Sequence, residues 1–172
     1  MIEEMEDLVS RKLAIKKTDG NGYTTYKYHN KVFYNNLWNP ALMECRGIVF
    51  DSNGEIAQRP FKKIFNLREN GADVPEGEFI AVRKVNGFMA AATWHSGSLL
   101  VSTTGTTTSD YAELARSWIE PYSDYIKCFP VYTFIFEIVD PSDPHIVEET
   151  PGVYLLGVRH KQTGVLNDVI LT

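Results

Sequence analysis

The stretch from Phe79 to Phe88 contains a lysine, Lys84, in a setting that could make its amine a nucleophile. An apolar run precedes Lys84, and the turn-forming pair Asn86-Gly87 follows it before a second apolar run begins. A lysine held between two packed segments can form a covalent bond to a substrate through its amine. The alternative is structural, because a lysine at a strand edge discourages pairing with other chains. The lysine-glycine spacing alone does not separate these two interpretations.

Two further charged side chains, Arg46 and Glu137, each lie inside a strongly apolar segment on either side of Lys84 in the sequence. A charge in such surroundings is costly without a partner, so we expect each of them to face a ligand. Arg46 could instead pair with Glu44 or Glu55, and Glu137 could face solvent on a half-exposed strand. We expect Arg46, Glu137 and Lys84 to share one cleft with the intervening Lys63.

Turn signals and apolar patterns divide the chain into many short strands and few helices. The clearest helix has Ser109 or Asp110 as its cap and an apolar face that includes Tyr111, Ala115 and Trp118. Strands are expected at 23–28, 31–34, 46–50, 55–58, 79–83, 88–94, 99–102, 131–139 and 152–158, and helices at 3–17 and 109–120. These elements predict an α+β domain built on antiparallel sheets.

Composition sets limits on the class of protein. The 172 residues suit one domain, and no apolar stretch approaches the ~20 residues of a membrane span. The acidic N-terminus is unlike a signal peptide, and two cysteines do not make a disulfide framework, so we expect a cytoplasmic protein. The net charge of −5 argues against a dedicated nucleic-acid binder, although basic residues gather at 11–17 and 59–68. RNA binding would therefore use more surface than this chain supplies.

The ordered motifs resemble those of the ATP-dependent RNA ligases of the T4 RNA ligase 1 type. The matching residues are Glu44-Cys45-Arg46-Gly47, Arg59-Pro60, Lys63, Phe65-Asn66, Lys84–Gly87, Gly105, Ser109-Asp110, Glu137, Leu155–Arg159 and Thr163-Gly164. The resemblance implies the nucleotidyltransferase fold shared with DNA ligases and capping enzymes, with residues 1–172 as its adenylyltransferase domain. It also implies adenylylation of a lysine by ATP, transfer of AMP to an RNA 5′-phosphate, and attack by a 3′-hydroxyl.

The resemblance assigns roles to the candidate residues. Lys84 is the AMP-accepting nucleophile, and the cations of Arg46 and Lys63 contact the nucleotide and favour the unprotonated lysine. Glu137 and Asn86 hold a metal ion, Mg²⁺ or Mn²⁺, through water. Gly87 lets the backbone approach the nucleotide, with a simple turn glycine as the alternative. Leu156 packs on adenine, although the same residue could be plain core.

The implied partners are RNA molecules with 5′-phosphate and 3′-hydroxyl ends, tRNA among the candidates, and the implied oligomeric state is a monomer. Two competing functions stay open: a degenerate domain that binds nucleotide or RNA without turnover, and a capping-type guanylyltransferase with the same lysine chemistry. The segments around Arg46 and Lys63 favour RNA ligase over capping.

Three departures from the family pattern bear on activity. The usual K-x-D-G motif has asparagine at Asn86, and Thr104 replaces a lysine that often precedes Gly105. The late E-G-x-V and K-x-K motifs are missing from the 172 residues. We therefore expect either an N-terminal fragment or a naturally shortened relative, with slow or no self-adenylylation.

Overall fold

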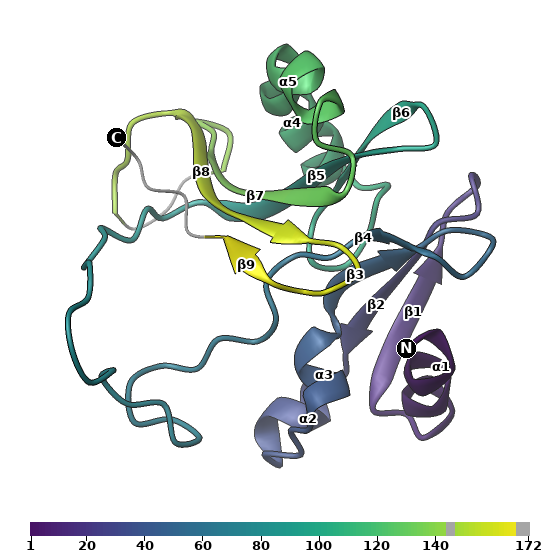
Figure 1. Ribbon diagram of the computed structural model, residues 1–172, viewed down its shortest axis with the longest axis vertical. Coiled ribbons are helices and arrows are strands. Elements are labelled where there is room, and N and C mark those ends of the chain that lie inside the picture. The colour runs from purple at the N-terminus through teal and green to yellow at the C-terminus, as the bar shows by residue number, and fades with distance from the viewer. Residues whose placement is uncertain (144–146, 168–172) are drawn as a thin grey trace.

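A computed structural model describes residues 1–143 and 147–167, which form two antiparallel sheets joined by a long loop (Figure 1). The first sheet has the order β1-β2-β3-β4, and the second has the order β6-β5-β7-β8-β9. The strands are β1 (Ala14–Thr18), β2 (Thr24–Tyr28), β3 (Arg46–Phe50), β4 (Ile56–Gln58), β5 (Phe88–His95), β6 (Ser98–Ser102), β7 (Tyr132–Val139), β8 (Gly152–His160) and β9 (Leu166–Asn167). The expected α+β fold with antiparallel sheets is confirmed.

The first sheet packs against three short helices: α1 (Ile2–Ser10), α2 (Asn30–Tyr34) and α3 (Pro40–Glu44). The core between them consists of apolar side chains that are almost fully buried, among them Met5, Leu42, Ile48 and Phe50. Helix α3 begins with Asn39 as its cap, whose Oδ1 accepts a hydrogen bond from the Leu42 amide at 2.8 Å. This cap stabilises the start of the helix that precedes β3, the strand that starts at Arg46.

Two expectations for this half of the molecule are wrong. The helix expected at 3–17 ends at Ser10, because residues Ala14–Thr18 pair with β2 instead. Pairing across a sheet overrides the weak helical periodicity there. The strand expected at 31–34 is the helix α2, whose first turn is capped by His29 through a hydrogen bond from the Lys31 amide to Nδ1.

The second sheet is covered on one face by α4 (Asp110–Ile119), the 3₁₀ turn η1 (Glu120–Tyr122) and α5 (Ser123–Lys127). The α4 helix is confirmed, with Ser109 Oγ accepting from the Ala112 amide at 3.1 Å. Its buried residues are Ala112, Ala115 and Ile119, whereas Tyr111, from the expected apolar face, is 46% exposed. The core of this half also contains Phe134, Phe136 and Ile138 from β7.

The strand expected at 79–83 is wrong, and this correction matters for Lys84. Residues 59–87 contain no helix or strand, and the side chains of Ile80 and Val82 are 81% and 80% exposed. The second sheet has the order β6-β5-β7-β8-β9, and residues 79–83 pair with none of these strands. The loop of residues 59–87 swings away from both sheets before it returns to β5 (Figure 1).

The two sheets meet through a small apolar contact that includes Val49, Ala57 and Leu100. Beside it, the buried Gln58 donates a hydrogen bond to the carbonyl of Leu100 at 3.3 Å. Among the described residues, no helix has both the length and the apolar character needed to cross a membrane. At the C-terminal end of the described residues, β9 pairs with β8.

Candidate functional site

Lys84 lies on the exposed end of the long loop, just before β5. Its Nζ donates a hydrogen bond to Oδ1 of Asn86 at 3.0 Å. Lys84 is exposed, so it is not held between two packed segments as the sequence suggested. The Asn86 side chain is therefore what orients the lysine amine within the described part of the chain.

Gly87 joins this turn to the second sheet. Its amide donates to Oε1 of Glu137 at 3.0 Å, so Glu137 faces the lysine turn and not bulk solvent. A Cβ atom at Gly87 would lie 2.1 Å from the carbonyl oxygen of Ile138, which no side chain can tolerate. The glycine is therefore required for close approach of the loop to β7, a reason different from the expected approach to nucleotide.

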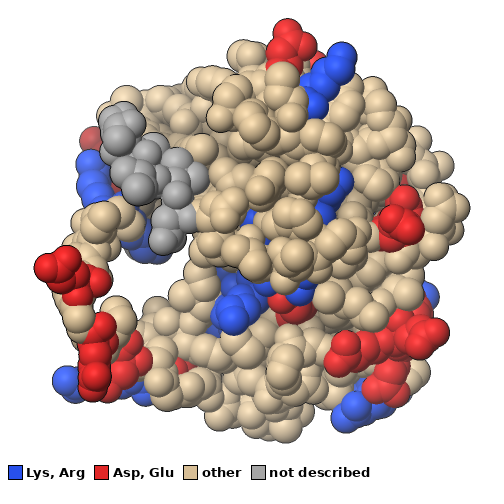
Figure 2. All heavy atoms as spheres, viewed as in Figure 1, with Lys and Arg blue, Asp and Glu red and all other residues tan. Residues whose placement is uncertain are grey.

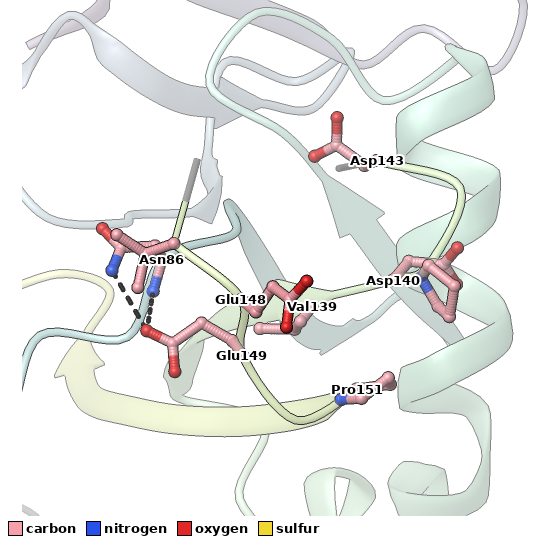
Figure 3. A pocket seen from close by; sticks show the side chains of 9 residues that line it. Asn86, Val139, Asp140, Asp143, Glu148, Glu149 and Pro151 are labelled. Atoms are coloured by element: carbon pink, nitrogen blue, oxygen red, sulfur yellow. Dashed lines mark hydrogen bonds between the residues drawn. The ribbon is translucent and has the colours of Figure 1, made fainter. Parts of the chain in front are cut away.

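The structure adds a residue that the sequence did not single out, Glu149, from the loop between β7 and β8. Its Oε1 accepts from the backbone amide of Asn86 at 3.3 Å and from Nδ2 of Asn86 at 3.0 Å (Figure 3). The other carboxylate oxygen of Glu149 pairs with Arg83. No local pattern marks Glu149, because its partners lie more than 60 residues earlier in the chain.

A pocket of about 370 Å³ opens beside this turn. Its lining includes Asn86 and the carboxylates of Asp140, Asp143, Glu148 and Glu149 (Figure 3). A site with this charge repels phosphate groups, so the pocket itself is a poor receptor for a nucleoside triphosphate. Nucleotide binding at Lys84 would therefore have to use surface outside this pocket.

Lys63 is held elsewhere, beside the first sheet. Its amide donates to the carbonyl of Met43 at 2.7 Å, and its Nζ lies 5.0–5.8 Å from the ring centres of Phe33, Trp38 and Phe65. These rings attract the ammonium group through their negative faces. The neighbouring Lys62 is exposed.

Arg46 and Leu156 have no described contact with the lysine turn. Arg46 is the half-buried first residue of β3, and its side chain makes no hydrogen bond or ion pair with a described residue. Its suggested pairing with Glu44 is wrong, because Glu44 has other partners. Leu156 is 41% exposed, so the plain-core interpretation is wrong, while its contact with adenine stays a prediction. The described contacts thus join Lys84, Asn86, Gly87 and Glu137, and a shared cleft with Arg46 and Lys63 stays a prediction.

The partners of Glu44 form the strongest electrostatic feature that the sequence did not predict. Arg159 donates to both carboxylate oxygens of Glu44 at 2.7 and 2.9 Å, and Arg59 donates to both at 3.0 and 3.2 Å. All three side chains are buried, with 6–14% exposure. Since Glu44 ends α3 and Arg159 lies in β8, the cluster ties the first sheet to the second.

Glu44 titrates abnormally because of this arrangement. Burial disfavours its charged form, but the hydrogen bonds from Arg159 and Arg59 outweigh burial and hold the pKa of the Glu44 carboxyl below its usual value. The cluster is therefore ionised at neutral pH. Gly164 leaves room for it, because a Cβ atom there would lie 2.7 Å from Cζ of Arg59.

The described residues fit a hydrated metal ion better than a directly coordinated one. No group of three or more His, Cys, Asp or Glu side chains among them is arranged to hold a metal. Glu137 and Asn86 each offer a side-chain oxygen at the Lys84–Gly87 turn. Mg²⁺ commonly keeps several of its waters and takes one or two protein oxygens, so this donor set suits water-mediated binding.

The charged side chains are unevenly distributed over the surface in Figure 2. On the face in Figure 2, Lys and Arg side chains lie in the hollow between the two halves of the molecule, with an acidic side chain among them. The acidic side chains visible on that face lie mostly at its edges. A hollow with this charge is complementary to an anion such as a polyphosphate or a nucleic-acid strand.

Comparisons with known proteins agree with the fold. The chain resembles a solved archaeal ATP-dependent RNA ligase (form 1) with a TM-score of 0.65 and 16% identity over 95% of this chain and 44% of that chain. RNA ligase 1 of bacteriophage TS2126 is 28% identical over 169 residues, which cover 87% of this chain and 42% of that protein. The chain therefore spans less than half the length of these relatives.

A sequence model described as RNA ligase matches residues 44–169, which run from the Glu44 cluster through the lysine turn to β9. This range is most of the chain and contains every residue of the candidate site. The chain accordingly belongs to the RNA ligase family related to T4 RNA ligase 1.

Proposed function

We propose that this protein takes part in ATP-dependent joining of RNA ends, with Lys84 as the residue that accepts AMP. The observation that carries the proposal is the contact of the lysine turn with Glu137, which brings an amine, an amide oxygen and a carboxylate to one place. Membership of the RNA ligase family supports the substrate class.

In the proposed first step, the unprotonated Nζ of Lys84 attacks the α-phosphorus of ATP. A nitrogen–phosphorus bond forms, the bond from the α-phosphorus to the bridging oxygen breaks, pyrophosphate leaves, and the amine loses a proton to solvent. A bound Mg²⁺ would neutralise charge on the phosphates. Asn86 orients the amine, and Glu137 holds the backbone of the turn through Gly87, so both contribute positioning.

Transfer of this AMP to an RNA 5′-phosphate and sealing with a 3′-hydroxyl complete the proposed reaction. The basic hollow in Figure 2 supports binding of the RNA backbone. RNA repair, with tRNA as one substrate, is the cellular role that we propose for it.

Radioactive ATP and Mg²⁺ test the first step. We expect covalent AMP to form slowly on the wild-type chain and not at all on Lys84→Ala, whereas Lys62→Ala, the exposed neighbour of Lys63, serves as the matched control. Labelling of Lys84→Ala at the wild-type level would contradict the assignment, and labelling by GTP in place of ATP would favour a capping-type enzyme.

A second candidate, a domain that binds nucleotide without turnover, is favoured by one observation. Lys84 is exposed, so the described residues hold its amine through Asn86 but do not enclose it for attack on a phosphate. ATP binding in calorimetry without any covalent adduct in mass spectrometry would support this alternative over the ligase.

A further inference from the structure

We infer that Glu149 is a positioning residue that sets the orientation of Lys84 through the side chain of Asn86. The inference deepens the proposed function and rests on it for the role of Lys84. Nothing in the sequence motifs assigns a role to Glu149, which lies in the loop between β7 and β8.

The geometry forms a continuous chain of hydrogen bonds. Glu149 Oε1 accepts from Asn86 Nδ2 at 3.0 Å, and Asn86 Oδ1 accepts from Lys84 Nζ at 3.0 Å. A carboxylate can only accept, so its contact with Nδ2 forces the amide oxygen of Asn86 to the opposite side, towards the lysine. Glu149 also accepts from the Asn86 backbone amide at 3.3 Å, which fixes the turn as well as the side chain.

The surroundings of Glu149 hold its carboxylate in place, so that it can orient the residues bonded to it. Its side chain is only 4% exposed, and its charge is countered by Arg83, whose side chain is 74% exposed. The lysine turn itself belongs to a loop without regular secondary structure. The described contacts that hold the turn are therefore the backbone anchor at Glu137 and the side-chain anchor at Glu149.

This arrangement gives a physical reason for asparagine in place of the usual aspartate at position 86. A carboxylate at that position would meet the Glu149 carboxylate at hydrogen-bond distance with no proton between them, and like charges this close repel strongly. The amide of Asn86 instead presents a donor to Glu149 and an acceptor to Lys84. Asn86 and Glu149 are thus a matched pair.

A set of three variants tests the pairing: Asn86→Asp, Glu149→Gln and the double variant. Asn86→Asp should slow formation of lysyl-AMP by on the order of 100-fold, because the turn that carries the nucleophile is displaced. Glu149→Gln should cost much less, since its amide oxygen still accepts from Asn86. The double variant should recover about 10-fold over Asn86→Asp, within the coupling range of contacting residues, because the new amide can donate to the new carboxylate. Absence of any recovery would overturn the pairing.

Hydrogen exchange measured by NMR tests the same contacts without ATP. Glu149→Ala should speed exchange at the Asn86 amide by about 10-fold, because the acceptor of that amide is lost. The Gly87 amide, which donates to Glu137, should be unchanged and serves as an internal reference. Glu148→Ala, an exposed neighbour in the same pocket, is the matched control.

The two measurements separate the possible failures. If the wild-type chain forms no lysyl-AMP, the proposed activity of this chain is contradicted, while the exchange data still decide the role of Glu149. If the Asn86 amide exchanges at the same rate in Glu149→Ala as in wild type, relative to the Gly87 amide, the positioning role is wrong. This holds even if adenylylation proceeds.

Discussion

Two buried carboxylates, Glu44 and Glu149, use arginine in different ways. Glu44 is 14% exposed and forms ion pairs with two arginines, Arg59 and Arg159, that are themselves buried. Glu149 is 4% exposed, but its arginine, Arg83, is 74% exposed and its other partner is Asn86. One cluster joins the two sheets, whereas the other joins two loops.

The different partners of the two carboxylates imply different roles, with Glu44 stabilising the fold and Glu149 positioning the lysine turn. A carboxylate with four hydrogen bonds from rigid, buried guanidinium groups fixes the relation of two sheets, and its loss leaves two cations unpaired. A carboxylate that holds a loop can be removed with little loss to the cores of either sheet. We therefore expect changes at Glu44 to alter global unfolding and changes around Glu149 to alter the lysine turn.

The largest expected effect is that of Glu44→Gln on stability. The substitution keeps the size of the side chain but removes the negative charge that Arg59 and Arg159 share, and breaking a buried pair typically costs about 3–5 kcal/mol. Chemical denaturation followed by circular dichroism measures the loss. Glu55→Gln, at an exposed position in the β3–β4 turn, is the matched control and should stay within about 0.5 kcal/mol of wild type. Equal stability of the two variants would show that the cluster does not hold the sheets together.

Acid pH should lower the free energy of unfolding through the same cluster, by less than the Glu44→Gln substitution does at neutral pH. The pKa of Glu44 is lowered in the folded protein, so its contribution to stability is complete above the ordinary value of 4.5 and is lost as pH falls through the folded value. The stability difference between wild type and Glu44→Gln should therefore shrink as pH falls below about 4.5. Urea denaturation at a series of pH values measures the difference. A gap that is constant down to strongly acid pH would contradict the lowered pKa.

Regular elements were predictable where the sequence carries local signals. The strand 46–50, its hairpin turn and the α4 helix follow from apolar runs, an Asp-Ser-Asn-Gly turn and a serine cap. Residues 79–83 show the limit, since an apolar run becomes a strand only when a neighbour pairs with it. Residues 14–18 show the converse, because pairing with β2 overrides a weak helical pattern.

The residues of the candidate site also fall into those that the sequence predicts and those that it does not. Lys84, Gly87 and Glu137 were predictable from residue type and order, and the structure brings them together. Glu149 was not, because its role depends on a contact across 63 residues between two loops. The Glu44 cluster spans 115 residues, so its members could be identified from the sequence but their pairing could not.

Arg83→Ala should have the smallest effect on stability, less than about 1 kcal/mol, because an exposed guanidinium contributes little to folding. The variant removes one partner of the buried Glu149 carboxylate, which could be costly in a dry interior. Here Glu149 keeps two hydrogen bonds from Asn86, so its charge stays partly compensated without Arg83. Chemical denaturation beside Glu44→Gln gives the comparison directly. A loss as large as that of Glu44→Gln would mean that both carboxylates serve stability and would remove the distinction between the two regions.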